Sequence, residues 1–210
     1  MSKGNEHSLS NQIVEGLMRR RTVVLSGEIN PESARLLGQQ MLALQIESSE
    51  PIKLLIDSCG GSIFQALQIC DAMTTLMKAP VTGVAFGSCG SAATLIMLHC
   101  KERQSSRNSR FLIHSGNISQ VSFTVNHTTQ ENLEQLMREA KAVDNKMMSV
   151  YEKYLTPTNW TSDKTPEEKR DFVRALIKRG DQKFDDWMSA EEAIECGLIT
   201  TIIEKLDIFD

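Results

Sequence analysis

The sequence lacks any apolar run near the roughly 18 residues that a membrane-spanning helix needs. Its first ten residues are polar and do not resemble a secretory signal. Lys and Arg number 23 against 27 Asp and Glu, and the resulting net charge of −4 argues against a nucleic-acid-binding surface. No CxxC pair is present, so no zinc site is indicated. We therefore expect a soluble, cytoplasmic protein that holds no metal and binds neither nucleic acid nor membrane.

Cysteine is sparse and unpaired, with five residues at positions 59, 70, 89, 100 and 196. An odd count without paired spacing is typical of reduced thiols in the cytosol. Cys70 and Cys100 lie in amphipathic helical stretches, where cysteine packs as a small hydrophobic residue. We expect Cys59 and Cys89 to fill space rather than to sense redox state. The only basic run, 19–21, is predicted to be a solvated segment before a strand.

The chain has the length of a single domain, 1–210, with enough apolar content for one core. After a polar tail over about 1–20, short apolar runs alternate with segments of helical periodicity. This alternation predicts an α/β fold with a largely parallel sheet and helices outside it. The predicted strands lie at 22–25, 54–56, 81–86, 111–113 and 198–203, and the predicted helices at 31–48, 62–77, 92–98 and 166–179.

A different pattern occupies the region from about 117 to 155. Residues 121–125 alternate as a strand, and an apolar stripe then continues from Leu133 to Tyr154 at helical spacing. So long a helix exceeds what a small core covers, so we expect it to project and bury its stripe against another subunit. The alternative is an ordinary helix packed on the core. No role is assigned to the following segment, 156–180.

Ser91 is the most informative residue, because it lies between the apolar stretch 81–86 and the helical stretch 92–100. A hydroxyl at a strand-to-helix junction, among residues too small to cover it, suits a nucleophile. The N–H groups of the following helical turn would face a negative charge developing there. The competing interpretation is that Ser91 caps the helix, and Ser88 is its nearest competitor as nucleophile.

A serine nucleophile needs a base and an orienting acid. Of the four histidines, His114 ends a short apolar strand, and its ring should emerge at a strand end, where sites in open sheets collect. Asp185 precedes a helix that begins with the capping box Ser189 to Glu192. Asp186 and Asp181 remain alternatives for the acid.

Five ordered segments together resemble the proteolytic subunit of the caseinolytic protease, the ClpP family. They are 21–29 (RTVVLSGEI), 55–62 (LIDSCGGS), 87–94 (GSCGSAAT), 108–114 (NSRFLIH) and 185–193 (DDWMSAEEA). The resemblance implies a crotonase-like spiral of β-α units with a projecting helix-strand handle. It also implies a serine endopeptidase that degrades unfolded polypeptides inside two stacked seven-membered rings, a tetradecamer, fed by an ATP-dependent AAA+ unfoldase. No cofactor is implied beyond the ATP that the partner uses.

Residue by residue, the resemblance assigns Ser91 as nucleophile, His114 as general base and Asp185 as the orienting carboxylate. It assigns the oxyanion hole to the backbone N–H groups of Gly60 and Ala92. Glycine at position 60 permits the close approach that such a site requires. Two other functions stay open: a catalytically silent ring subunit that scaffolds or gates an active peptidase, and a crotonase-like acyl-CoA enzyme.

Overall fold

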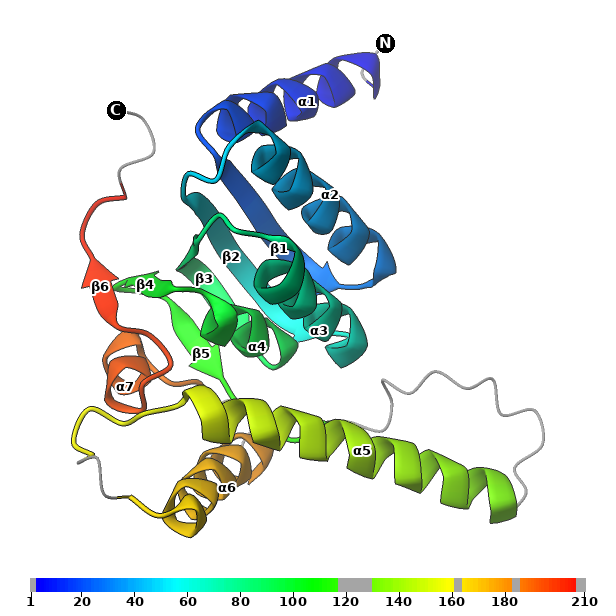
Figure 1. The fold of residues 1–210 in the computed structure, drawn as a ribbon, viewed down its shortest axis with the longest axis vertical. Coiled ribbons are helices and arrows are strands. Elements are labelled where there is room, and N and C mark those ends of the chain that lie inside the picture. The colour runs from blue at the N-terminus through cyan, green and yellow to red at the C-terminus, as the bar shows by residue number, and fades with distance from the viewer. Residues whose placement is uncertain (1–2, 117–129, 161–163, 183–185, 207–210) are drawn as a thin grey trace.

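The computed structural model describes residues 3–116, 130–160, 164–182 and 186–206 (Figure 1). In chain order its elements are α1 (Lys3–Arg19), β1 (Thr22–Ile29), α2 (Pro31–Glu47), β2 (Ile52–Gly61), α3 (Ile63–Asp71), the π-helical turn η1 (Ala72–Leu76), β3 (Val81–Gly90), α4 (Ala92–His99), β4 (Glu102–Ser106), β5 (Arg110–Leu112), α5 (Gln130–Tyr154), α6 (Pro166–Gln182), α7 (Ala190–Glu195) and β6 (Thr201–Ile203).

The strands form one six-stranded sheet in the order β1-β2-β3-β4-β6, with β5 also paired to β3. Every pairing within this described sheet is parallel. Helices α2, α3 and α4 follow β1, β2 and β3 and lie on one face of the sheet (Figure 1). The predicted α/β fold of β-α units with a parallel sheet is thus confirmed.

Local signals account for several of these elements. Asn30 accepts hydrogen bonds from the backbone of Glu32 and Ser33 and so caps α2, with Pro31 in its first turn. The first half of β2 is buried on both faces, as expected for a strand inside a parallel sheet. Helix α4 is buried from Ala92 to Leu98, because it lies between the sheet and α5.

The two halves of β3 pair with different strands on the same side, so the sheet splits between β4 and β5. The first half, 82–85, pairs with β4, and the second half, 88–90, pairs with β5. Between them the register against β2 shifts. The Asp57 side chain fills this irregularity, because Ser88 N–H donates to Asp57 Oδ1 at 2.8 Å and a Cβ at Gly87 would collide with the same carboxylate.

Helix α5 has two different ends. Its C-terminal half packs on the body through Met147 and Tyr151, and Leu155 continues this buried face just beyond the helix. Its N-terminal half extends away from the α/β body (Figure 1), and Met137 there is 65% exposed. The predicted long helix is confirmed. The strand predicted at 121–125 lies outside the described residues.

Three segments differ from the expectations. The predicted polar tail is helical in α1, and the polar sequence of β4 forms a strand because β3 and β6 flank it. Arg21, predicted to be solvated, instead donates to the backbone carbonyls of Leu44, Ser48, Glu50 and Pro51. Its guanidinium therefore holds the C-terminal end of α2 and the turn after it.

The cysteines are all free, and every one except Cys59 is buried. None of the described helices is both long and apolar enough to cross a bilayer.

Candidate active site

Ser91 occupies a strained turn between β3 and α4. Its backbone has φ 51° and ψ −126°, and among the described residues only Arg21 is another non-glycine residue with positive φ. Such a conformation costs of order 1–3 kcal/mol and persists only where neighbours enforce it. Ser91 N–H donates to the Leu112 carbonyl at 2.7 Å, and the Ser91 carbonyl accepts from Thr94 N–H at 3.0 Å. These bonds join the turn to β5 and to α4.

The Ser91 side chain does not serve the helix that it precedes. It makes no capping hydrogen bond to the first turn of α4, so the capping interpretation of this serine is not what the structure shows. The competing Ser88 is engaged elsewhere, because its Oγ accepts from Arg110 Nε at 3.2 Å. Strain together with an uncommitted hydroxyl is the arrangement of a nucleophile elbow.

Gly60 brings β2 directly against this turn. A Cβ at Gly60 would lie 2.7 Å from Ser91 Cβ and 3.0 Å from Ala92 N, and its φ of +105° favours glycine. The two predicted oxyanion donors therefore lie beside each other and beside Ser91. The Gly60 N–H donates to Ser58 Oγ at 3.1 Å, and this hydroxyl donates to the Gly27 carbonyl at 2.5 Å. Ser58 is a buried residue of the site for which the sequence carried no signal.

His114 follows β5 at the same edge of the sheet where Ser91 follows β3. The register pairs Gly90 with Leu112, so Ser91 and His114 leave adjacent parallel strands one and two residues beyond that pair. Gly180 of α6 packs on the backbone here, because a Cβ on it would collide with the Ile113 carbonyl.

The acid of the predicted triad, Asp185, lies outside the described residues. Both alternatives have other partners: Asp181 Oδ1 accepts from Ser115 N–H and Oγ, at 2.8 and 3.0 Å, and Asp186 pairs with Arg179 at 3.0 Å. The chain just after them returns to β5, where Met188 and Phe111 exchange two backbone hydrogen bonds of 2.7 and 2.9 Å.

The remaining polar groups nearby are structural. Cys89, two residues before Ser91, is fully buried, and this burial raises the pKa of its thiol far above the usual range. The His99 ring lies against Tyr154, its Nδ1 donates to the Leu95 carbonyl at 2.7 Å, and burial lowers its pKa. No cluster of metal-binding side chains occurs in the described part of the chain.

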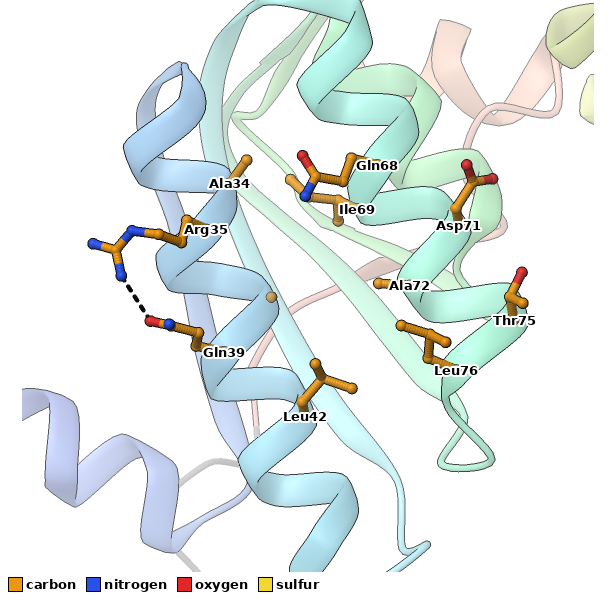
Figure 2. Close-up of a pocket in the computed structure, with 11 residues that line it drawn as sticks. Ala34, Arg35, Gln39, Leu42, Gln68, Ile69, Asp71, Ala72, Thr75 and Leu76 are labelled. Carbon is orange, nitrogen blue, oxygen red and sulfur yellow. Dashed lines mark hydrogen bonds between the residues drawn. The ribbon is translucent and has the colours of Figure 1, made fainter.

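A second concavity lies between α2 and the α3–η1 segment (Figure 2). This groove, about 650 Å³, is lined by apolar residues such as Leu42 and Leu76, and Arg35 donates to Gln39 at its rim. Its lining contains no serine, histidine or cysteine, and its polar residues include Asp71 and Thr75.

A parallel sheet of β-α units, with a strained serine at a strand-to-helix turn, defines an α/β protein. A family profile described as Clp protease matches residues 4–206. The chain therefore belongs to the Clp protease family, its fold is the crotonase-like one of that family, and the predicted resemblance is confirmed.

The similar proteins are proteolytic subunits of ATP-dependent Clp proteases. The chain is 28% identical to subunit 2 of Treponema pallidum over 204 residues, which cover 95% of this chain and 91% of the relative. It is 29% identical to the subunit of Leuconostoc citreum, with 90% and 86% covered. It is 27% identical to subunit 2 of Pseudomonas aeruginosa, with 95% and 90% covered. The likeness thus extends over nearly the whole of each chain.

Proposed function

We propose that this protein is a serine endopeptidase in which Ser91 is the nucleophile, His114 the general base and Asp185 the residue that orients the imidazole. Ser91 Oγ attacks a peptide carbonyl while His114 accepts its proton and then passes it to the leaving amine. Water repeats the sequence and releases the acyl group. The observation that carries this proposal is the strained Ser91, whose hydroxyl caps no helix and whose Cβ lies close against Gly60.

The oxyanion hole is proposed to form from Ala92 N–H and the glycine pair of β2. In support, Ala92 N lies at the Gly60 contact, in the first turn of α4. Gly60 N–H must leave Ser58 Oγ before it can donate to an oxyanion. Gly61, which also has positive φ, is the alternative donor of this pair.

Support for Asp185 comes from spacing. Phe111 and Met188 form an antiparallel bridge. His114 lies three residues after Phe111 in the sequence, and Asp185 lies three residues before Met188. The bridge brings Met188 against the strand that ends just before His114, and Asp185 is close to Met188 in sequence. Asp186 and Asp181 bind Arg179 and Ser115, so we prefer Asp185.

We further propose that the subunits assemble as two stacked seven-membered rings and degrade unfolded polypeptides delivered by an ATP-dependent unfoldase in the cytoplasm. The support is the family and the names of its relatives. The projecting half of α5 is the candidate contact between rings, because it extends from the body and leaves the apolar side chain of Met137 65% exposed.

A fluorophosphonate probe tests the nucleophile. We expect wild-type protein to be labelled and Ser91→Ala to lose labelling, with peptide hydrolysis falling by roughly 10³-fold or more. Ser88→Ala is the matched control, because it removes the same atom three residues earlier from a hydroxyl that binds Arg110, and it should still be labelled. Undiminished labelling of Ser91→Ala would exclude this assignment.

A silent ring subunit that scaffolds an active partner is the second candidate. It is favoured by the hydrogen bond to Ser58 Oγ that occupies Gly60 N–H, one of the two predicted oxyanion donors. Native mass spectrometry followed by a fluorogenic peptide assay, with and without an unfoldase, separates the two. Rings that never cleave the peptide would support the scaffold.

A further inference from the structure

A buried chain of hydrogen bonds connects the projecting helix α5 to the Ser91 turn. Tyr151 Oη of α5 lies 2.8 Å from Thr94 Oγ1 of α4, and Thr94 Oγ1 donates to the Ser91 carbonyl at 2.6 Å. Both side chains are fully buried, with 0% exposed surface. Buried hydroxyls keep their partners because losing one leaves a polar group with neither protein nor water to bind.

The direction of each bond follows from the protons available. The Ser91 carbonyl has no proton, so the single proton of Thr94 Oγ1 must lie between them. Thr94 then has only lone pairs for Tyr151, and the Tyr151 hydroxyl is the donor. Burial also raises the pKa of Tyr151, which keeps this hydroxyl protonated. The hydrogen bonds therefore all point the same way: Tyr151 donates to Thr94, and Thr94 donates to the Ser91 carbonyl.

The Ser91 carbonyl controls the orientation of the Ala92 N–H. Both belong to one planar peptide, and the described chain contains no cis peptide bond, so the C=O and N–H point in opposite directions. Fixing the carbonyl toward Thr94 therefore turns the Ala92 N–H away from Thr94, at the place where Ala92 N approaches the Gly60 turn. This N–H is the proposed oxyanion donor.

Tyr151 lies on the part of α5 that packs on the body. Met147 precedes it by one turn and Leu155 follows it by one turn, and both are buried. The other end of the same helix carries the exposed Met137. A shift of α5 would therefore be transmitted through one hydroxyl to the turn that carries the nucleophile.

We propose that Tyr151 is a positioning residue for catalysis, which acts through Thr94 to hold the Ser91–Ala92 peptide in the orientation that presents Ala92 N–H to the oxyanion. This inference rests on the proposed peptidase function. It makes α5 part of the catalytic support as well as a projecting element.

Tyr151→Phe is the direct test, because it removes one oxygen and keeps the ring in the core. Loss of a whole oxyanion donor costs about 10²–10³ in kcat, so loosening one should lower kcat by about 3- to 10-fold with KM unchanged. Tyr154→Phe is the matched control: it removes the same atom three residues later on the same helix, from a ring that packs on His99. It should leave kcat at the wild-type value.

Thr94 variants separate positioning from simple packing. Thr94→Val keeps the shape but removes the hydroxyl that binds the Ser91 carbonyl and leaves only the Thr94 N–H bonded to it, so kcat should fall further, by about 10-fold. Thr94→Ser restores a hydroxyl and should recover most of the activity. Adding Tyr151→Phe to Thr94→Val should cause no further loss of kcat, because the two residues act through one bond chain.

All variants are assayed with a fluorogenic peptide and the fluorophosphonate probe, at a temperature where thermal unfolding and native mass show folded protein of wild-type assembly. Wild-type kcat in Tyr151→Phe, an equal loss in Tyr154→Phe, or additive losses with Thr94→Val would overturn the inference and leave the peptidase assignment intact. Absence of labelling at Ser91 in the wild-type protein would instead overturn both.

Discussion

At the site edge of the sheet, backbones meet with no room for a methyl group, whereas α5 carries large apolar side chains, some buried and some exposed to solvent. Gly60 touches the Ser91 turn, and Gly180 touches the Ile113 carbonyl. On α5, Met147 is 1% exposed and Met137 is 65% exposed, although both occupy one regular helix. The first region depends on backbone geometry, and the second on which side of a helix the body covers.

The two regions also differ in how far apart in sequence their stabilising contacts lie. The site edge obtains its strained Ser91 from contacts between elements distant in sequence, such as Ser91 with Leu112. Helix α5 follows from the apolar periodicity of its own sequence, and only its C-terminal half packs on the α/β body. Tyr151 and Thr94 are where the two regions meet.

The largest effect is expected from Gly60→Ala. The new Cβ would lie 2.7 Å from Ser91 Cβ and 2.8 Å from the Gly90 carbonyl, at a φ of +105°. We expect kcat to fall by about 100-fold or more, because the turn carrying Ser91 and Ala92 must move. The free energy of unfolding should fall by about 2–4 kcal/mol. Peptide hydrolysis and urea unfolding measure the two effects.

Two other glycines serve as controls for that variant. Gly27 also has positive φ, but a Cβ on it would meet nothing within 4 Å, so Gly27→Ala should lose only the strain energy, about 1–2 kcal/mol. Gly38 lies inside α2, and a Cβ on it would also meet nothing within 4 Å. Gly38→Ala should keep wild-type activity and raise the free energy of unfolding by up to about 1 kcal/mol. Wild-type activity in Gly60→Ala would contradict the close contact.

Within α5, the same substitution, methionine to alanine, can be made at a buried and at an exposed position. Met147→Ala should reduce the free energy of unfolding by about 2–5 kcal/mol, because it empties a buried position. Met137→Ala should change it by no more than about 0.5 kcal/mol. Native mass spectrometry of the second variant adds the test of assembly: weakened oligomers would indicate that the exposed half is an inter-subunit contact. Equal losses of stability would show that α5 does not have two different ends.

The smallest effect is a pH dependence where α4 meets α5. Burial, aided by Lys153, lowers the pKa of His99 below its ordinary value of 6.5, against a raising effect from the Leu95 carbonyl. The unfolded chain therefore takes up the proton first as the pH falls. The contribution of His99 is fully present above about pH 6.5 and is lost as the pH falls toward the folded-state pKa. Urea unfolding between pH 7.5 and 5 measures this loss, and His99→Gln should flatten the slope; an unchanged slope would assign it to other groups.

Patterns within one segment were enough to predict many elements. The Asn30–Pro31 pair located the start of α2, the apolar stripe located α5, and the Ser189 capping box located α7. Each of these signals lies within a few residues or one helical face. Ser91 was also found at its strand-to-helix junction, because apolar and small residues mark both sides of it. Its catalytic role, with that of His114 and Asp185, remains a prediction.

The sequence by itself determined the alternation of strands and helices, the family and the candidate nucleophile, because periodicity and short motifs are local properties. Only the tertiary structure decided that polar β4 is a strand, that Arg21 binds carbonyls after α2, and that Ser58 occupies the Gly60 N–H. It also decided that Tyr151 reaches Thr94, 57 residues away in the chain. These contacts depend on which segments the folded sheet brings together, and a hydroxyl or a guanidinium acquires its partner only when two distant backbones meet.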